Sequence, residues 1–352
     1  MSDSVTLKIG GQVIENFLSY SIEADIYTAD DAFTVDVANP EIRIDPGKLC
    51  ELWVNGEREM TGIIDRIDDG YGRRGSSMRI EGRDLCGLLT DSHCDPPFED
   101  FEDMTCKDLA ERLLKNVPYI MRNMISYQES IRGKSGDSDS FVEGQDTTQN
   151  FVKIEPGQTI FDVLKTYAGS RGMMFFHVPD GRQGKFVFGK PRNGGTPLYY
   201  LYTRKTDPGE NNILEGDRVR DISRRYSKIS VIGQQQGTDD YGAEDINTDG
   251  TVTDSSFPFY KPYIAMDNND SQSPHLRAQM MMERMRFDGF QLTYRVAGHS
   301  QNGRNWRINE MCRIIDEHFG VDGNYLIYGR TFERSEQGTF TTIKLSYPGV
   351  VF

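Results

Sequence analysis

Apolar and polar residues alternate along the N-terminal section of the chain. Three runs show this alternation most clearly: Val5, Leu7 and Ile9; Ile22, Ala24 and Ile26; and Phe33, Val35 and Val37. A period of two places each apolar set on one face of a β-sheet. Because no helical pattern interrupts these short strands, this section is predicted to fold as a small barrel or sandwich.

Two glycine-containing turns punctuate this section. Asn55-Gly56 separates the strand-like runs 49–54 and 60–67. It supplies the positive φ angles of a type I′ turn and predicts a hairpin. Gly70-Tyr-Gly-Arg-Arg-Gly75 resembles a phosphate-binding loop only in its glycines, since the Lys-Ser/Thr of that motif is missing. A hairpin loop is the expected structure there.

The middle of the chain has a helical period. Residues 105–117 are predicted to form a helix with one apolar face. Thr105 would cap the start of this helix, and Asp108 stands three positions later, as in a capping box. Thr159 and Asp162 repeat that arrangement before a second helix, for which Gly169 and Gly172 are stop candidates. A hairpin should follow at 173–178 and 186–188, with its turn at Asp180-Gly181, and the Ser-, Asp- and Gly-rich segment 133–150 should be an exposed loop.

Strand patterns return after residue 210. A helix is predicted over 274–287, with Ser273 as its cap and Pro274 at its first position. The polar, glycine-rich stretch 234–254 is interpreted as a flexible excursion. The predicted fold is therefore mainly β with an α+β middle: a first β-barrel-like domain at 1–94, a mixed region at 95–210, and a second β-barrel-like domain at 211–352 with a flexible insertion near 234–258.

Charge and cysteine content narrow the class of protein. Lys and Arg number 40 against 54 Asp and Glu, so the formal net charge is −14. A protein that grips nucleic acid needs the opposite balance, although an acidic wall suits a conduit through which DNA passes. Five cysteines without a CxxC pair argue against a disulfide framework or zinc ribbon and fit a reducing cytoplasm. Neither a secretory signal nor a membrane-spanning apolar stretch is evident.

No residue set has the spacing that catalysis or metal binding requires. His93-Cys94-Asp95 is the only run with metal-ligand types, and a surface turn before Pro96-Pro97 explains it better. Paired carboxylates could support cell-wall hydrolysis, but nothing local in the sequence singles out any pair. The sequence therefore predicts no catalytic residue, no cofactor and no metal, and a protein that is not an enzyme.

One segment supports a rival function. Lys153 to Leu164, KIEPGQTIFDVL, resembles the opening of a LysM glycan-binding module, in which a Pro-Gly turn leads through a Thr cap into a short helix. A peptidoglycan-binding module, or a protein with cell-wall hydrolase activity, is the alternative to a structural role.

The ordered set of motifs carries a broader resemblance. It includes Asp31-Ala32-Phe33, Asn39-Pro40, Pro46-Gly47, Asn55-Gly56, Gly82-Arg83-Asp84, Leu88 to Ser92, and Gly303 to Asn309. In this order the chain resembles Mu-like prophage tail proteins and the late-control D family of baseplate hub proteins of contractile-tail phages.

That resemblance implies a homotrimer at the centre of a virion tail baseplate, assembled in the bacterial host cytoplasm. The trimer would bind the tail spike protein at one end and tube and baseplate proteins at the other, and DNA would pass through without specific binding. Aromatic residues are enriched at the centre of such interfaces. Trp306 and Tyr325 are therefore the candidate interface residues, with ordinary core packing as the competing explanation for each.

Overall fold

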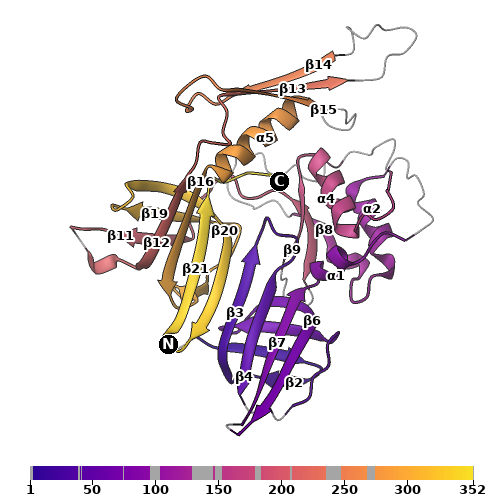
Figure 1. The fold of residues 1–352 in the computed structure, drawn as a ribbon, viewed down its shortest axis with the longest axis vertical. Coiled ribbons are helices and arrows are strands. Elements are labelled where there is room, and N and C mark those ends of the chain that lie inside the picture. Colours follow the sequence, from indigo (N-terminus) through magenta and orange to yellow (C-terminus); the bar gives the residue numbers. More distant parts are fainter. Residues whose placement is uncertain are drawn as a thin grey trace.

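The computed structural model describes residues 3–38, 40, 42–73, 75–95, 104–128, 146, 153–178, 184–206, 208–234, 247–267 and 274–351. Figure 1 shows a strand-rich body, a mixed helical part beside it, and a small unit that projects from one end. The prediction of a mainly β chain is confirmed, because most of the strands belong to one large, largely antiparallel sheet.

The N-terminal strands form one half of that sheet. They are β1 (Val5–Ile9), β2 (Gln12–Ile14), β3 (Phe17–Asp25), β4 (Ala32–Ala38), β5 (Leu49–Val54), β6 (Glu57–Gly72) and β7 (Gly75–Asp84). Their spatial order is β3-β4-β7-β6-β5-β1-β2. The hairpin predicted at Asn55-Gly56 is confirmed, with φ of 51° and 79° at these two residues as a type I′ turn requires.

The C-terminal strands form the other half. They are β11 (Tyr199–Thr203), β12 (Ile213–Arg220), β16 (Phe290–Ala297), β19 (Glu310–Asp316), β20 (Val321–Ser335) and β21 (Gly338–Ser346). Strands β12, β16, β21 and β20 follow one another, β19 pairs with β20, and β11 runs parallel to β19. A two-stranded ribbon of β17 (Ser300–Gln301) and β18 (Arg304–Asn305) lies between β16 and β19 in the sequence.

Strand β20 joins the two halves. Its second half pairs antiparallel with β3, so that Phe332 lies opposite Ile22. Both side chains are almost fully buried, and they belong to one hydrophobic core that takes residues from both halves. Among the described strands the path stays open from β12 to β2, and no closed barrel is detected.

The middle part has its own core. Its elements are α1 (Cys86–Asp91), α2 (Cys106–Leu113), η1 (Leu114–Asn116), η2 (Arg122–Met124), β8 (Ile125–Tyr127), α4 (Ile160–Ser170), β9 (Met174–Val178), β10 (Lys185–Gly189) and η3 (Pro208–Glu210). The capping box of Thr105 and Asp108 is confirmed, and the Thr159 side chain accepts the backbone N–H of Asp162. Helix α2 ends at Leu113 and is followed directly by the 3₁₀ helix η1. The helix end predicted at Val117 is therefore too late.

A small unit contains β13 (Lys228–Gln234), β14 (Asn247–Thr253), β15 (Pro262–Asp267) and α5 (Pro274–Asp288). The predicted helix is confirmed, but Ser273 lies outside the described residues, as do Asp180-Gly181 and all of 133–150 except Asp146. The prediction of a flexible excursion over 234–254 is wrong for 247–253, which pair with β13 as β14. A Cβ on Gly250 would lie 2.2 Å from the His275 backbone nitrogen, so a glycine lets α5 approach this strand closely.

Candidate functional site

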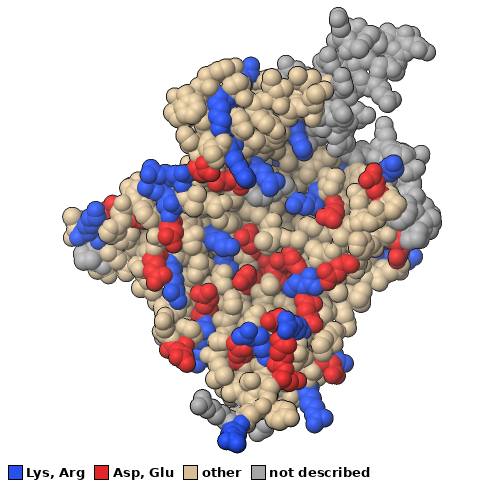
Figure 2. Space-filling model, in the orientation of Figure 1, with Lys and Arg blue, Asp and Glu red and all other residues tan. Residues whose placement is uncertain are grey.

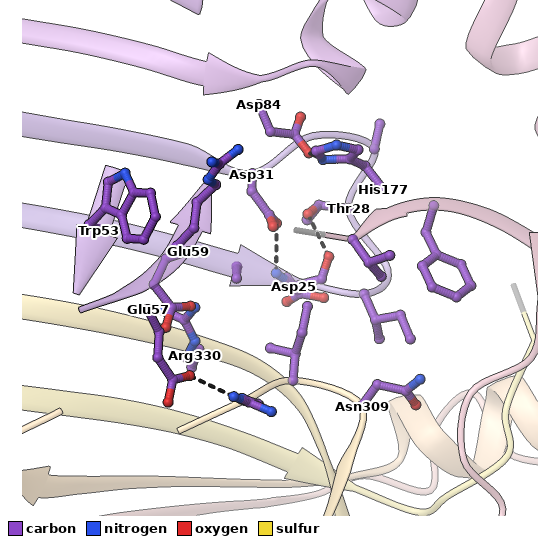
Figure 3. Close-up of a pocket in the computed structure, with 18 residues that line it drawn as sticks. Asp25, Thr28, Asp31, Trp53, Glu57, Glu59, Asp84, His177, Asn309 and Arg330 are labelled. Atoms are coloured by element: carbon purple, nitrogen blue, oxygen red, sulfur yellow. Dashed lines mark hydrogen bonds and ion pairs between the residues drawn. The ribbon is translucent and has the colours of Figure 1, made fainter. Parts of the chain in front are cut away.

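A cavity of about 400 Å³ lies where the N-terminal strands, the middle part and the C-terminal strands meet (Figure 3). Its walls come from the end of β3 and the loop after it, from β5, β6, β7 and β9, and from β20 and the segment before β19. The lining residues are Ala24, Asp25, Ile26, Thr28, Ala29, Asp31, Trp53, Glu57, Arg58, Glu59, Asp84, Phe176, His177, Val178, Arg307, Ile308, Asn309 and Arg330. This concentration of charged side chains at a junction makes the cavity the candidate site.

Asp84 and His177 link two parts of the chain. Asp84 ends β7, and its Oδ1 accepts the backbone N–H of Cys86 at 3.0 Å. Its Oδ2 lies 3.0 Å from Nδ1 of His177, which β9 of the middle part contributes. The two side chains are 4% and 3% exposed, respectively. A buried polar contact of this kind stabilises only when both partners are present.

Two further aspartates stand next to this pair. Asp31 Oδ1 accepts the backbone N–H of Asp25 at 2.9 Å, and Asp25 Oδ1 accepts the backbone N–H of Tyr27 at 3.0 Å. Burial, reinforced by the neighbouring Asp84 carboxylate, holds the pKa of Asp31 well above its usual value. Burial also raises the pKa of Asp25, although the hydrogen bond from Tyr27 acts in the opposite direction.

The opposite wall holds ion pairs between the two halves of the sheet. Arg330 on β20 pairs with Glu59 on β6, and Arg307 pairs with Glu57 at 2.6 Å. Glu59 also accepts a hydrogen bond from the Asn305 side chain at 2.7 Å. Figure 3 shows Glu57, Glu59 and Arg330 on one side of the cavity and Asp84 with His177 on the other. Charged groups on both walls thus bind to partners from other parts of the fold.

This geometry suits a structural joint better than acid–base chemistry. A general acid or base must reach substrate. Here Asp84 and Asp31 accept backbone N–H groups that hold two loops in place, and Glu59 is paired with a buried guanidinium. Within the part of the chain that the structure describes, no group of three or more His, Cys, Asp or Glu residues is arranged to hold a metal ion.

The two predicted interface residues lie in different environments. Trp306 is 2% exposed, and its ring centroid is 4.7 Å from that of Tyr199 within the shared core. Tyr325 is partly buried and stacks on Phe290 at 5.6 Å. Neither lines the cavity. In the single chain Trp306 therefore has little surface to offer a partner, whereas part of Tyr325 stays accessible.

The other sequence candidates are built into the middle part. His93 Nδ1 lies 2.9 Å from the carbonyl oxygen of Gly157, and Cys94 is buried in the core of this part. The LysM-like segment folds as a turn and a capped helix, but Ile160, Phe161 and Leu164 of that helix also belong to this core. All five cysteines are buried with free thiols.

Sequence reasoning did not identify the junction residues as a site. In the sequence, Asp84 is notable only as the last residue of the Gly82-Arg83-Asp84 motif. His177 and Arg330 lie 93 and 246 positions beyond it. Only the fold brings them together, and no local spacing could have marked them.

Comparison with known proteins identifies the relatives of this chain. A family model described as the N-terminal domain of Mu phage baseplate assembly protein GpP-like matches residues 4–84. Models for the third domain of tail protein NMB1110-like and for a tail protein C-terminal domain match 225–281 and 284–350. The three matched segments make this chain a relative of the Mu-like baseplate and tail proteins. The resemblance seen in the sequence is thereby confirmed.

Individual relatives match nearly the whole length of this chain. The baseplate hub protein gp44 of Escherichia phage Mu is 22% identical over 342 residues, which are 94% of this chain and 83% of gp44. The tail protein from Neisseria meningitidis MC58 has 24% identity and a TM-score of 0.81 and covers 100% of this chain and 98% of its own. The 43 kDa tail protein of prophage MuSo2 from Shewanella oneidensis has 21% identity and a TM-score of 0.77, with 98% of each chain covered.

These matches relate the chain to tail and baseplate proteins of phages. The relatives are named as tail, baseplate assembly or hub proteins rather than as enzymes. Among the described residues, no helix is both long and apolar enough to cross a membrane.

Proposed function

We propose that this Mu-like tail protein is the hub of a contractile-tail baseplate: a homotrimer that joins the tail tube to the central spike and forms part of the DNA conduit. The observation that carries the proposal is the pairing of β20 with β3, which places two strand-rich halves in one sheet around one core. The named role of gp44 as a baseplate hub protein supports it.

The two halves would act as two barrel-like units of one subunit. Each half is a run of mainly antiparallel strands, and the two are joined along the β20–β3 pair. Three such subunits would then present six similar units, which adapts a three-fold spike to a six-fold tube. The proposed division is 1–94, 95–210 and 211–352, with the small unit that a separate family model matches at 225–281 inside the last part.

The open sheet edges fit an assembly. Strands β12 and β2 end the sheet path and leave backbone groups on one side unpaired within the described sheet. Such edges favour association, and a closed symmetric oligomer covers them. We retain Tyr325 as a candidate interface side chain because part of its ring is accessible, whereas Trp306 would act only by supporting the residues around it.

The net charge of −14 suits a wall that DNA passes without binding. Phosphates near an acidic surface are repelled and release no counterions to drive association. This leaves the duplex free to move.

Assembly with the partners tests the proposal. The purified chain would be mixed with the central spike protein of the same phage, and the mass of the complex would be measured by light scattering after size exclusion. A complex of three chains with one trimeric spike supports the hub role, and the absence of any complex contradicts it. Peptidoglycan co-sedimentation and a zymogram on the same protein would reveal glycan binding or wall hydrolysis, the two rival functions.

A further inference from the structure

The hairpin of β6 and β7 (Figure 1) ends in a tip, defined here as residues 70–73 and 75, that carries the exposed side chains of Tyr71 and Arg73. Gly72 pairs with Gly75, which confirms the hairpin predicted for this glycine-rich run. Tyr71 is 98% exposed, and Arg73 beside it is also exposed. Beyond Ile64, β6 pairs with β7 alone among the described strands.

An aromatic ring in this position contributes almost nothing to folding. Burial of apolar area is what makes a tyrosine stabilising, and Tyr71 buries almost none within the single chain. Tyr and Arg are the residues most enriched among side chains that anchor protein interfaces. Because the paired hairpin already holds the backbone, docking this tip would cost little conformational entropy. The tip therefore has the properties of an interface anchor.

The same sheet carries an acidic surface of complementary charge. On the outward side of β20, β3 and β7, Glu23 is exposed and Glu333 and Glu81 are partly exposed, while the alternate residues Ile22, Phe332 and Ile80 point into the core. In register, Glu23 lies opposite Thr331, and Glu333 lies opposite Ser21. Figure 2 shows carboxylates, with some basic side chains among them, where Figure 1 labels β3, β4 and β7.

We propose that the tip, through Tyr71 and Arg73, docks onto the acidic outward surface at Glu23, Glu81 and Glu333 of a second copy of this chain. The hairpin belongs to the same sheet as that surface and cannot fold back onto it within one subunit. The contact joins two different surfaces, so it is head-to-tail and can close into a ring. A chain of net charge −14 repels copies of itself, and a basic tip offsets that repulsion where the copies touch.

This inference rests on the proposed homotrimer and is tested by charge reversal in the full-length chain. Arg73→Glu and, separately, Glu23→Lys with Glu333→Lys should each weaken self-association at least tenfold, as measured by sedimentation velocity over a range of concentrations. The combination of all three substitutions should restore most of the lost affinity. Tyr71→Ala should weaken association by a similar factor.

Tyr260→Ala is the matched control, because Tyr260 is a 78%-exposed tyrosine on the projecting unit. It should leave self-association unchanged. If wild type and tip variants form equally stable trimers, the inference is wrong and the hub proposal stands. If the wild-type chain never self-associates, even with the spike protein present, both fail. Salt-sensitive DNA binding by the wild type that Arg73→Glu removes, without an effect on self-association, would assign the tip to nucleic acid and also overturn the inference.

Discussion

Asp84 Oδ2 and His177 Nδ1 lie 3.0 Å apart in the buried joint between the N-terminal strands and the middle part. The ring of His177 is held from its other side as well. Gly184 has a φ of +86°, and a Cβ on it would lie 2.2 Å from Nε2 of His177, so only a glycine leaves room for this ring. The position of the middle part against the sheet therefore depends on a few close contacts.

Removing one partner of this pair should be costly. Asp84→Ala leaves the imidazole nitrogen and the Cys86 N–H without their acceptor, and should lower the free energy of unfolding by about 3 kcal/mol in urea titrations. Asp68→Ala is the control, since it breaks the exposed Arg66–Asp68 pair and should cost less than about 0.5 kcal/mol. Equal effects of the two substitutions would show that the joint does not stabilise the fold.

Asp31 should make stability depend on pH. Its folded-state pKa is raised by burial and by Asp84, so the folded protein holds this proton more tightly than the unfolded chain does. Its contribution to stability is therefore fully present below the ordinary pKa of an aspartate and is lost as pH rises through the raised value. Asp31→Asn, whose amide oxygen can still accept the Asp25 N–H, should raise the melting temperature at pH 8 and leave it almost unchanged near pH 3.5. A variant that melts below wild type at pH 8 would contradict this account.

Trp306 should matter through its volume rather than its N–H. Its Nε1 has no hydrogen-bond partner among the described residues, and the ring packs on Tyr199. Trp306→Phe should thus cost about 1 kcal/mol, whereas Trp306→Ala should cost about 3–5 kcal/mol by opening a cavity. Calorimetry compares the two variants. If Trp306→Phe dissociates the assembly without changing the stability of the fold, Trp306 acts at an interface and not in the core.

Short-range signals predicted the local structure well. Asn55-Gly56 determines its own turn through backbone conformation, and Thr105 with Asp108 determines a helix start through hydrogen bonds three residues apart. Strand β14 was missed because Val252 is the only apolar side chain of the run NTDGTVT, so no alternation marks it. Strand β14 forms in spite of this weak pattern, because it pairs with β13 and packs closely against α5.

Long-range relationships were beyond local reasoning. The Phe332–Ile22 pairing joins residues about three hundred positions apart, and the Asp84–His177 contact spans 93. Neither follows from propensity or period, because both depend on how completed elements pack. The order of motifs along the whole chain predicted the related proteins, which local patterns could not do. It did not indicate which residues meet at the junction.

The mass of the purified chain in solution tests the central claim most directly. One subunit has a mass of 40.1 kDa. Multi-angle light scattering at micromolar concentration should give about 120 kDa, three times the subunit mass, as expected of a cyclic homotrimer. A mass of one subunit at every concentration, unchanged when the spike protein is added, would contradict the hub account.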